Sequence, residues 1–347
     1  MANCHPLFLE FTVNISLLKS KKDRMISSRE TVRNLIRNHF ILHHPEYEPM
    51  FFIQGSNKMG LPIRNGDDTC DLDDGVYFLR KPDISPTTLQ KWVLEAVQGH
   101  TSGGQQHRKK CIRVIYVQDY HIDLPVYYKS ETDKHPFLAV KDTGWESSDP
   151  REFVKWFVGQ KDKKGQLVRI IKALKAWCDK RERSSQYKMP SGLCMTLLAC
   201  NHIAYNDRDD LALRDTLKNI QRAIDDTRFK TAKWTCKMPT TPFDDLFEKY
   251  DVVLKRNFLA ALDNFYQDAQ LSIQERNERK ASLLWRKHLG ERFPLGEDKE
   301  DSAHLSALRE IASTFSSSFL TPAGGLTTSM TQVGYTYHRN HGDEADV

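Results

Sequence analysis

Three aspartates lie in two segments whose residue pattern is typical of β-strands. Asp71 and Asp73 begin the first segment, and because side chains alternate along a strand, both fall on one face while Leu72 and Asp74 fall on the other. Asp123 lies within the second segment, on the face opposite its apolar residues. Carboxylates that share a face repel each other unless a cation lies between them, and Mg²⁺ prefers such oxygen ligands. The pattern favours a divalent-metal site if the two strands are neighbours.

Each of these signals, taken alone, has a simpler explanation. An Asp-x-Asp pair is often a solvated strand end, and Asp123 could face water at a sheet edge. Gly55-Ser56 follows an apolar strand, where backbone amides and a serine hydroxyl can hold a phosphate, although most Gly-Ser dipeptides are plain turns. The chain has no G-x-x-x-x-G-K-[ST] pattern, which excludes a P-loop.

The composition describes a globular protein. The 347 residues suggest about two domains, and 39% hydrophobic with 28% charged residues and 10% aromatic residues exclude disorder for most of the chain. The net charge of +5 does not by itself indicate a nucleic-acid binder. Seven scattered cysteines without a C-x-x-C pair argue against a disulfide framework and a zinc ribbon. We expect a cytoplasmic protein, because no apolar run approaches a membrane span and the start does not read as a signal peptide.

The periodicity of apolar residues places strands first and helices second. We expect strands at 50–54, 70–79, 112–117 and 121–128. Helices are expected at 28–43, 87–98, 150–158, 165–183, 191–206, 209–225, 243–268 and 271–288. Alternation over 11–17 is either a weak strand or the lead-in to a helix, and Asp149-Pro150 followed by Glu152 is a good helix start. The Ser/Thr/Gly-rich end of the chain is expected to be a mobile tail.

The order of the motifs is more specific than any one of them. Gly55 precedes Asp71 by sixteen residues (71 − 55), and Asp123 follows Asp73 by fifty (123 − 73). This order resembles the cGAS/DncV-like nucleotidyltransferases, the bacterial synthases of cyclic oligonucleotide signals in anti-phage defence. The resemblance is carried by Gln54-Gly55-Ser56, Asp71-Leu72-Asp73-Asp74-Gly75-Val76-Tyr77 and His121-Ile122-Asp123-Leu124-Pro125-Val126-Tyr127, and it continues in Trp145, Ser148-Asp149-Pro150, Trp156-Phe157, Lys175-Ala176-Trp177 and Pro190-Ser191.

The resemblance implies an α+β, bilobal nucleotidyltransferase fold of the Pol β-like kind, with a mixed β-sheet catalytic lobe and an α-helical lobe. Its boundaries here would be 1–148 for the catalytic lobe with an N-terminal spine helix, 149–312 for the helical lobe and 313–347 for a flexible tail. Asp71 and Asp73 would hold two Mg²⁺ ions, for which Mn²⁺ can substitute. Asp123 would complete the metal that holds the attacking ribose hydroxyl.

The resemblance also implies a set of nucleotide-binding residues. Gln54 and Ser56 would contact the donor triphosphate at the Gly55 turn. Lys175 would reach a phosphate across the cleft, the alternative being a lysine that snorkels on a helix flank. Ser191 would help to hold the nucleotide, the alternative being a simple helix N-cap.

The implied activity is the condensation of nucleoside triphosphates, ATP or GTP, into a cyclic di- or trinucleotide with release of pyrophosphate. The product would act on a downstream effector in anti-phage signalling. Two other functions remain open: a linear nucleotidyltransferase acting on RNA or protein, and a catalytically silent binding module. We expect no membrane partner and no nucleic-acid activator, because the basic clusters lie among acidic residues. Some family members are joined to targets by a ubiquitin-like conjugation enzyme, but the terminal Asp346-Val347 argues against that partner.

Overall fold

The computed structural model describes residues 1–347 except 186, 230–233, 299–309, 311–318, 321–325 and 328–347. Residues 1–296 form one compact unit, and residues 297–347 form a second. In the second unit, strands β9 (Phe319–Leu320) and β10 (Leu326–Thr327) pair antiparallel, and the rest of the tail predicted over 313–347 lies outside the described residues. In the part of the chain that is described, no helix combines the length and apolarity needed to cross a membrane.

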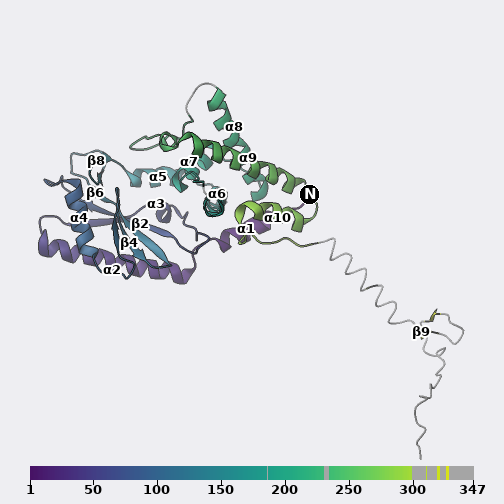
Figure 1. Ribbon diagram of the computed structural model, residues 1–347, viewed down its shortest axis with the longest axis horizontal. Coiled ribbons are helices and arrows are strands. Elements are labelled where there is room, and N and C mark those ends of the chain that lie inside the picture. The colour runs from purple at the N-terminus through teal and green to yellow at the C-terminus, as the bar shows by residue number, and fades with distance from the viewer. Residues whose placement is uncertain (186, 230–233, 299–309, 311–318, 321–325, 328–347) are drawn as a thin grey trace, which may run out of the picture. The chain divides into compact units, whose positions relative to one another are not determined.

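A mixed, eight-stranded sheet contains the two aspartate segments (Figure 1). Its strands are β1 (Pro49–Ile53), β2 (Asp71–Phe78), β3 (Gln105–His107), β4 (Ile112–Tyr116), β5 (Tyr120–Leu124), β6 (Val126–Tyr128), β7 (Phe137–Val140) and β8 (Gly144–Ser147). Strand β2 is central: β1 pairs with it antiparallel, while β5 and β6 pair with it in parallel. The predictions at the sequence level missed β3, β7 and β8, which are short.

The register of β2 fixes where the aspartates meet. Asp73 lies opposite Asp123 on β5, and Val76 lies opposite Val126 on β6, so the offset is fifty residues on both sides of Pro125. Strands β5 and β6 are therefore two parts of one line along β2. The condition for a shared carboxylate site, that the strand of Asp123 lies beside the strand of Asp71 and Asp73, is therefore met.

Two helices cover one face of the sheet. Helices α2 (Lys19–His43) and α4 (Pro86–Val97) pack their apolar sides against β2, β4, β5 and β6. The buried residues of this sheet core include Val32, Ile36, Phe40, Val76, Phe78, Leu89, Val93, Ile122 and Val126. Helix α2 begins earlier than the predicted start at residue 28, because Lys21 and Met25 continue its buried side through a polar stretch.

A buried ion pair joins α2 to the central strand. Asp74 points to the face opposite Asp73, as the alternation predicts, and its side chain has no solvent exposure. Arg33 of α2 donates to both of its oxygens, at 2.7 Å from Nε and 2.6 Å from Nη2. The carboxylate next to Asp73 in sequence therefore serves the fold.

The second half of the compact unit is helical. After the short α3 (Gly55–Met59), the helices are α5 (Pro150–Gln160), α6 (Gln166–Ser184), α7 (Gly192–His202), α8 (Asp209–Phe229), the 3₁₀ helix η1 (Leu246–Lys249), α9 (Val252–Gln274) and α10 (Glu278–Leu289). The predicted helix start at Asp149 is confirmed, since its side chain accepts a hydrogen bond from the Glu152 amide at 2.9 Å. The predicted break near residue 270 is wrong, because α9 continues to Gln274.

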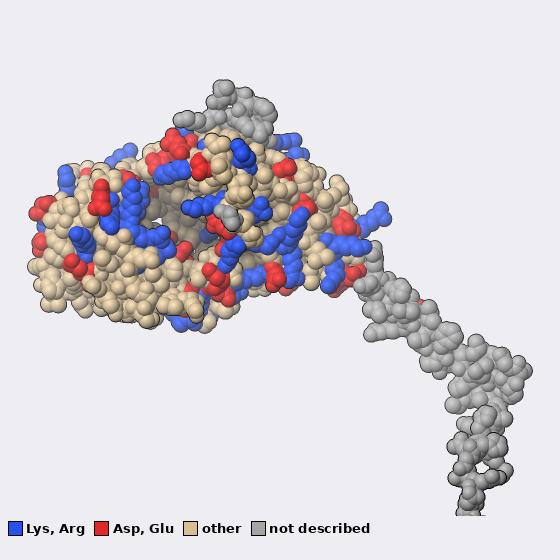
Figure 2. All heavy atoms as spheres, viewed as in Figure 1, with Lys and Arg blue, Asp and Glu red and all other residues tan. Residues whose placement is uncertain are grey.

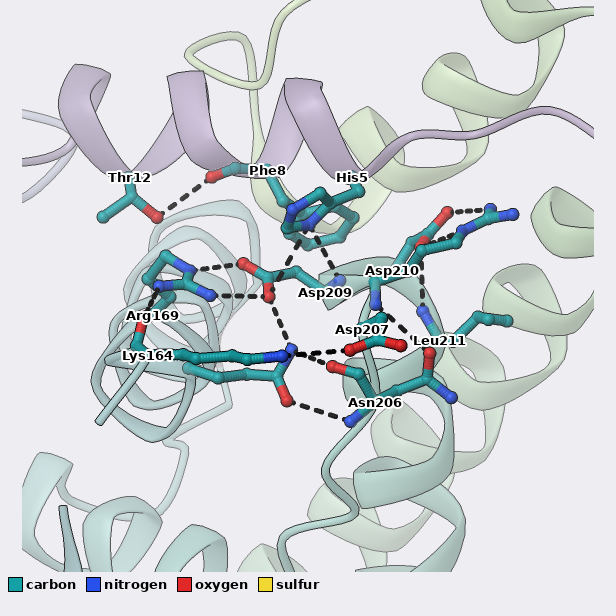
Figure 3. A network of polar contacts seen from close by, with 12 residues as sticks. His5, Phe8, Thr12, Lys164, Arg169, Asn206, Asp207, Asp209, Asp210 and Leu211 are labelled. Carbon is teal, nitrogen blue, oxygen red and sulfur yellow. Dashed lines mark hydrogen bonds and ion pairs between the residues drawn. The ribbon is translucent and has the colours of Figure 1, made fainter. Parts of the chain in front are cut away.

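The N-terminal residues pack into the helical core. Of the ambiguous segment 11–17, residues 11–14 are helical and form the end of α1 (His5–Asn14). The Phe8 ring packs edge-on against Trp285, with centroids 4.9 Å apart. Figure 3 shows the polar contacts beside it. Arg169 Nε donates to the Asp209 carboxylate at 2.5 Å, and the backbone amide of Asp209 donates to His5 Nδ1 at 3.0 Å. Residues Ala2 to Ile15 thus share a core with the helices, although residues 49–147 intervene before those helices begin.

We expect Asp74→Ala to lower the free energy of unfolding by about 3 kcal/mol, because the buried Arg33 guanidinium loses both of its short hydrogen bonds to Asp74 and keeps one longer bond, to Glu30, at 3.2 Å. Urea denaturation followed by circular dichroism measures the change. Replacing both residues, as Asp74→Leu with Arg33→Met, should recover most of the loss. Asp207→Ala removes an exposed ion pair with Lys164 and should cost less than about 1 kcal/mol. Equal losses from Asp74→Ala and Asp207→Ala would contradict the prediction.

Candidate active site

A cavity of about 610 Å³ brings the predicted residues together. Asp71, Asp73 and Asp123 line it from the sheet, and Lys175 and Gly192 line it from the helices. Its volume is in the range of small-molecule sites. Figure 2 shows a recess between the sheet part and the helical part of the surface, with Lys and Arg side chains at its rim.

The three carboxylates differ in exposure. The side chain of Asp71 is 55% exposed and that of Asp123 only 14% exposed. Burial raises the pKa of Asp73 to about 7, and the neighbouring charges of Asp123 and Asp71 act in the same direction. Burial is the largest cause, and Lys175 and Arg113 act in the opposite direction.

Arg113 is a residue of this site that sequence reasoning missed. It lies on β4 opposite Asp123 and donates to both carboxylate oxygens, from Nε and Nη2 at 2.7 Å each. The same Nη2 lies 3.9 Å from Asp71. The signal was present in the sequence, because Arg113 occupies a polar position of the predicted strand 112–117. Its pairing with Asp123 depends on the hairpin register, which the sequence pattern does not reveal.

The Gly55-Ser56 turn lies against the aspartates. Gly55 begins α3 with φ of +61°, and a Cβ placed on it would lie 2.1 Å from Asp73 Oδ2. Only glycine fits both the left-handed backbone and this close approach. Ser56 lines the cavity beside it. The turn therefore brings its backbone against Asp73 and its serine to the cavity wall.

Gln54 lines the cavity, but its side chain is buried and points between strands. Both ends of its amide are hydrogen-bonded to tyrosine hydroxyls, those of Tyr127 and Tyr77. The predicted contact of Gln54 with a triphosphate stays a prediction, and in this conformation its amide is bonded to the two tyrosines. Its backbone amide donates to the Asp73 carbonyl at 3.1 Å.

The two residues predicted on helices have different surroundings. Lys175 lies on the cavity wall, where its Nζ donates to the Leu61 carbonyl at 2.9 Å. Burial lowers the pKa of Lys175 to about 8, although Asp73 and Asp71 act in the opposite direction. Ser191 is the N-cap of α7, accepting from the Cys194 amide at 3.3 Å, and the adjacent Gly192 is the residue that lines the cavity.

Two groups of side chains could hold a divalent cation. The three aspartates offer hard oxygen donors on one cavity wall, and burial together with their mutual repulsion raises the pKa of Asp73, so they fit Mg²⁺ or Mn²⁺. Within the described ranges, the group whose ligand atoms all lie within 4.8 Å of one another is a different one, formed by His135, Asp149 and Glu152. That group already has internal partners, because His135 Nδ1 lies 3.2 Å from Asp149.

Comparisons with known proteins agree with the geometry. Residues 49–127 match the family described as "Cyclic GMP-AMP synthase DncV-like, nucleotidyltransferase domain". Among solved structures, the chain is similar to Vibrio cholerae DncV in complex with the linear intermediate 5′ pppA(3′,5′)pG, with a TM-score of 0.72 and 17% identity over 85% of this chain and 99% of that chain. It is also similar to the Bradyrhizobium diazoefficiens CD-NTase CdnG in complex with GTP, with a TM-score of 0.70 and 15% identity over 83% of this chain and 95% of that chain.

These matches settle part of what the motifs predict. The resemblance to cGAS/DncV-like nucleotidyltransferases and the α+β nucleotidyltransferase fold are confirmed. The prediction of a nucleotidyltransferase enzyme is confirmed by the same domain.

We expect Asp73→Asn to raise the melting temperature at pH 8 and to change it much less at pH 5. The folded-state pKa of Asp73, about 7, lies above the unfolded value near 3.9, so the charged carboxyl destabilises the metal-free protein increasingly from about pH 4 to pH 7. At pH 5 the folded-state side chain is still protonated, and only the first part of this loss of stability has accumulated. Thermal unfolding in metal-free buffer at the two pH values measures the effect. Asp207→Asn, at a fully solvated position, is the control, and an equal shift for Asp73→Asn at both pH values would refute the expectation.

Proposed function

Because the chain carries a DncV-like nucleotidyltransferase domain, we propose that it condenses nucleoside triphosphates, ATP or GTP, into a cyclic di- or trinucleotide and releases pyrophosphate. One observation carries the proposal: the parallel register puts Asp73 beside Asp123, on the wall of a cavity that Gly55, Ser56 and Lys175 also line. The neighbours support it, since DncV is described as a cyclic AMP-GMP synthase and its structures contain GTP and a linear intermediate.

The acidic residues of the site would bind metal ions, and its basic residues would bind phosphate. Asp71, Asp73 and Asp123 would hold two Mg²⁺ ions, with Mn²⁺ as a substitute. The bound ions supply a lowered pKa for the attacking hydroxyl and neutralise the leaving pyrophosphate. For Asp123 to serve as a ligand, Arg113 must share or release one of its two oxygens. A released guanidinium is well suited to a phosphate.

The nucleotide is held from both halves of the cavity. Ser56 and the backbone at Gly55 would bind the donor triphosphate, and the Lys175 ammonium would reach a phosphate from the helical side. The attacking ribose oxygen forms a bond to the α-phosphorus while the bond to pyrophosphate breaks, and the Asp123 carboxylate takes the hydroxyl proton. Positioning and charge neutralisation supply most of the catalysis in this reaction. Ser191 would help to hold the nucleotide indirectly, as the N-cap that fixes the start of α7, where Gly192 lines the cavity.

The proposed enzyme would have two lobes and would act in a signalling pathway. The catalytic lobe would lie within residues 1–148 and the helical lobe within 149–312, with residues 2–15 packed on the helical side. The protein would work in the cytoplasm, and its product would activate an effector in anti-phage defence.

The test is incubation with each labelled nucleoside triphosphate, and with mixtures, in Mg²⁺ or Mn²⁺, followed by phosphatase. We expect a small labelled product that survives phosphatase, since a cyclic phosphodiester has no terminal phosphate. The Asp71→Ala/Asp73→Ala variant should lose at least about a hundredfold of this activity, because several kcal/mol of transition-state stabilisation disappear with the metals. Asp207→Ala should keep it.

The other outcomes distinguish the alternatives. Label transferred to RNA or protein would indicate a linear nucleotidyltransferase, and no turnover with any mixture would indicate a binding module. An Asp71→Ala/Asp73→Ala variant as active as the parent would show that the reaction occurs elsewhere.

A further inference from the structure

The Gln54 amide lies between two buried tyrosines. Its Nε2 donates to the Tyr127 hydroxyl at 3.2 Å, and the Tyr77 hydroxyl donates to its Oε1 at 3.3 Å. The two ends of the amide thus bridge the two tyrosine hydroxyls, each of which can donate or accept. The three residues are 6%, 3% and 2% exposed for Gln54, Tyr127 and Tyr77, and the two tyrosine rings stack with centroids 4.6 Å apart. We refer to Tyr77, Tyr127 and the Gln54 amide as the tyrosine clamp.

The space around the tyrosine clamp is full. A Cβ on Gly75 would lie 2.6 Å from the Tyr77 ring and 2.7 Å from Gln54 Oε1. Glycine at this position of β2 leaves room for both groups, and no side chain there could avoid moving one of them. The amide therefore has one place to lie.

The backbone of the same residue is fixed to the aspartate strand. The Gln54 amide nitrogen donates to the Asp73 carbonyl at 3.1 Å. The next residue, Gly55, turns the chain with φ of +61° and passes so close to Asp73 Oδ2 that a Cβ would be 2.1 Å away. The direction in which residue 54 leaves β1 therefore decides where Gly55 and Ser56 lie relative to Asp73.

Burying the three polar groups of the tyrosine clamp costs desolvation free energy. The small core around Tyr77 and Tyr127 is otherwise built from Leu138, Val140 and the partly buried Phe52. Apolar residues of similar size would pack there without three polar groups to satisfy, whereas buried polar groups fix one orientation when all are paired. What the tyrosine clamp adds is a defined direction for the turn.

We propose that Tyr77 and Tyr127 are positioning residues for nucleotidyl transfer: they hold Gln54, and through it the Gly55-Ser56 turn, in register with Asp73. The inference rests on the proposed function for its kinetic consequence only. It replaces a direct contact between the Gln54 amide and a triphosphate with an indirect role.

The experiment compares Tyr77→Phe and Tyr127→Phe, each of which removes one hydroxyl, with Tyr128→Phe. Tyr128 is the next residue on β6, and its ring packs on Phe137 and Trp145 in the sheet core, so the same chemical change is made outside the tyrosine clamp. Hydrogen–deuterium exchange of residues 53–60 in the full-length protein reports on the turn without any substrate. Steady-state assays give kcat and KM for the donor triphosphate, and thermal unfolding gives the melting temperature.

We expect both clamp variants to exchange faster at residues 55–57 than the parent and Tyr128→Phe. Their kcat should fall about tenfold at temperatures where they remain folded. A lower melting temperature with unchanged local exchange, kcat and KM would overturn the proposal, because it describes a purely structural role. Loss of activity in Gln54→Leu alone, with both tyrosine variants like the parent, would also overturn it and favour direct contact. If the parent makes no nucleotide product, the proposed function fails, while the exchange comparison still decides whether the tyrosine clamp holds the turn.

Discussion

Repulsion among three carboxylates is the constraint that organises this molecule. Parallel pairing of β2 with β5 places Asp73 beside Asp123, with Asp71 at the strand end, and no sheet would choose that arrangement for its own stability. The compensation comes from both sides of the cavity. Arg113 reaches Asp123 from the neighbouring strand β4, and Lys175 approaches Asp73 from α6. Burial and the two neighbouring carboxylates nevertheless keep the pKa of Asp73 high, so added positive charge would favour its ionised form.

Much of this arrangement can be predicted from the sequence, because it depends on the local alternation of polar and apolar residues. The period of two separates Asp73 from Asp74, and the N-cap pattern at Asp149 fixes the start of α5. The order of the motifs identifies the family. Two things escape local reading. Strands β7 and β8 are only four residues each, and they are strands because β7 pairs with β6 and β8 pairs with β7. The alternating segment 11–17 includes the end of helix α1, which packs Phe8 against Trp285 far along the chain.

The candidate site shows the same division. Asp71, Asp73, Asp123, Ser56 and Lys175 are found where the motifs predict them, on one cavity. The roles of polar partners could not be predicted, because each depends on a contact between distant strands. In the sequence, Arg113 reads as a surface residue, whereas in the structure the β4–β5 hairpin pairs it with Asp123. In the sequence, the side-chain amide of Gln54 reads as a ligand-binding group, whereas in the structure it is hydrogen-bonded to two tyrosines. Sequence patterns identify groups that can do chemistry, whereas the structure decides which of them are already engaged.

The chain passes between the two cores close to the site. Met59 at the end of α3 and Leu61 just after it are buried among the helices, while Cys70 and Leu72 are buried in the sheet core. The segment between them is held by arginine: Arg292 Nη1 donates to the carbonyls of Arg64 and Asn65 at 2.7 and 2.9 Å. Along the chain, the turn at Gly55 therefore follows strand β1 and precedes residues that are buried in the helical core. Rearrangement of the helices would be transmitted directly to the turn that faces Asp73.

The constant offset of fifty residues between β2 and the β5–β6 line has a consequence for how this chain can change length. Asp73 and Asp123 meet because strand pairing aligns them, and the residues that connect the two strands only have to return the chain to the same edge. Insertions at the turn containing Gly99 and Gly104, before β3, should therefore leave the aspartates in place. One extra residue within β5 ahead of Asp123 would instead turn its carboxylate to the opposite face. Relatives of this chain can diverge in the length of that connection, but not in the phase of the two strands.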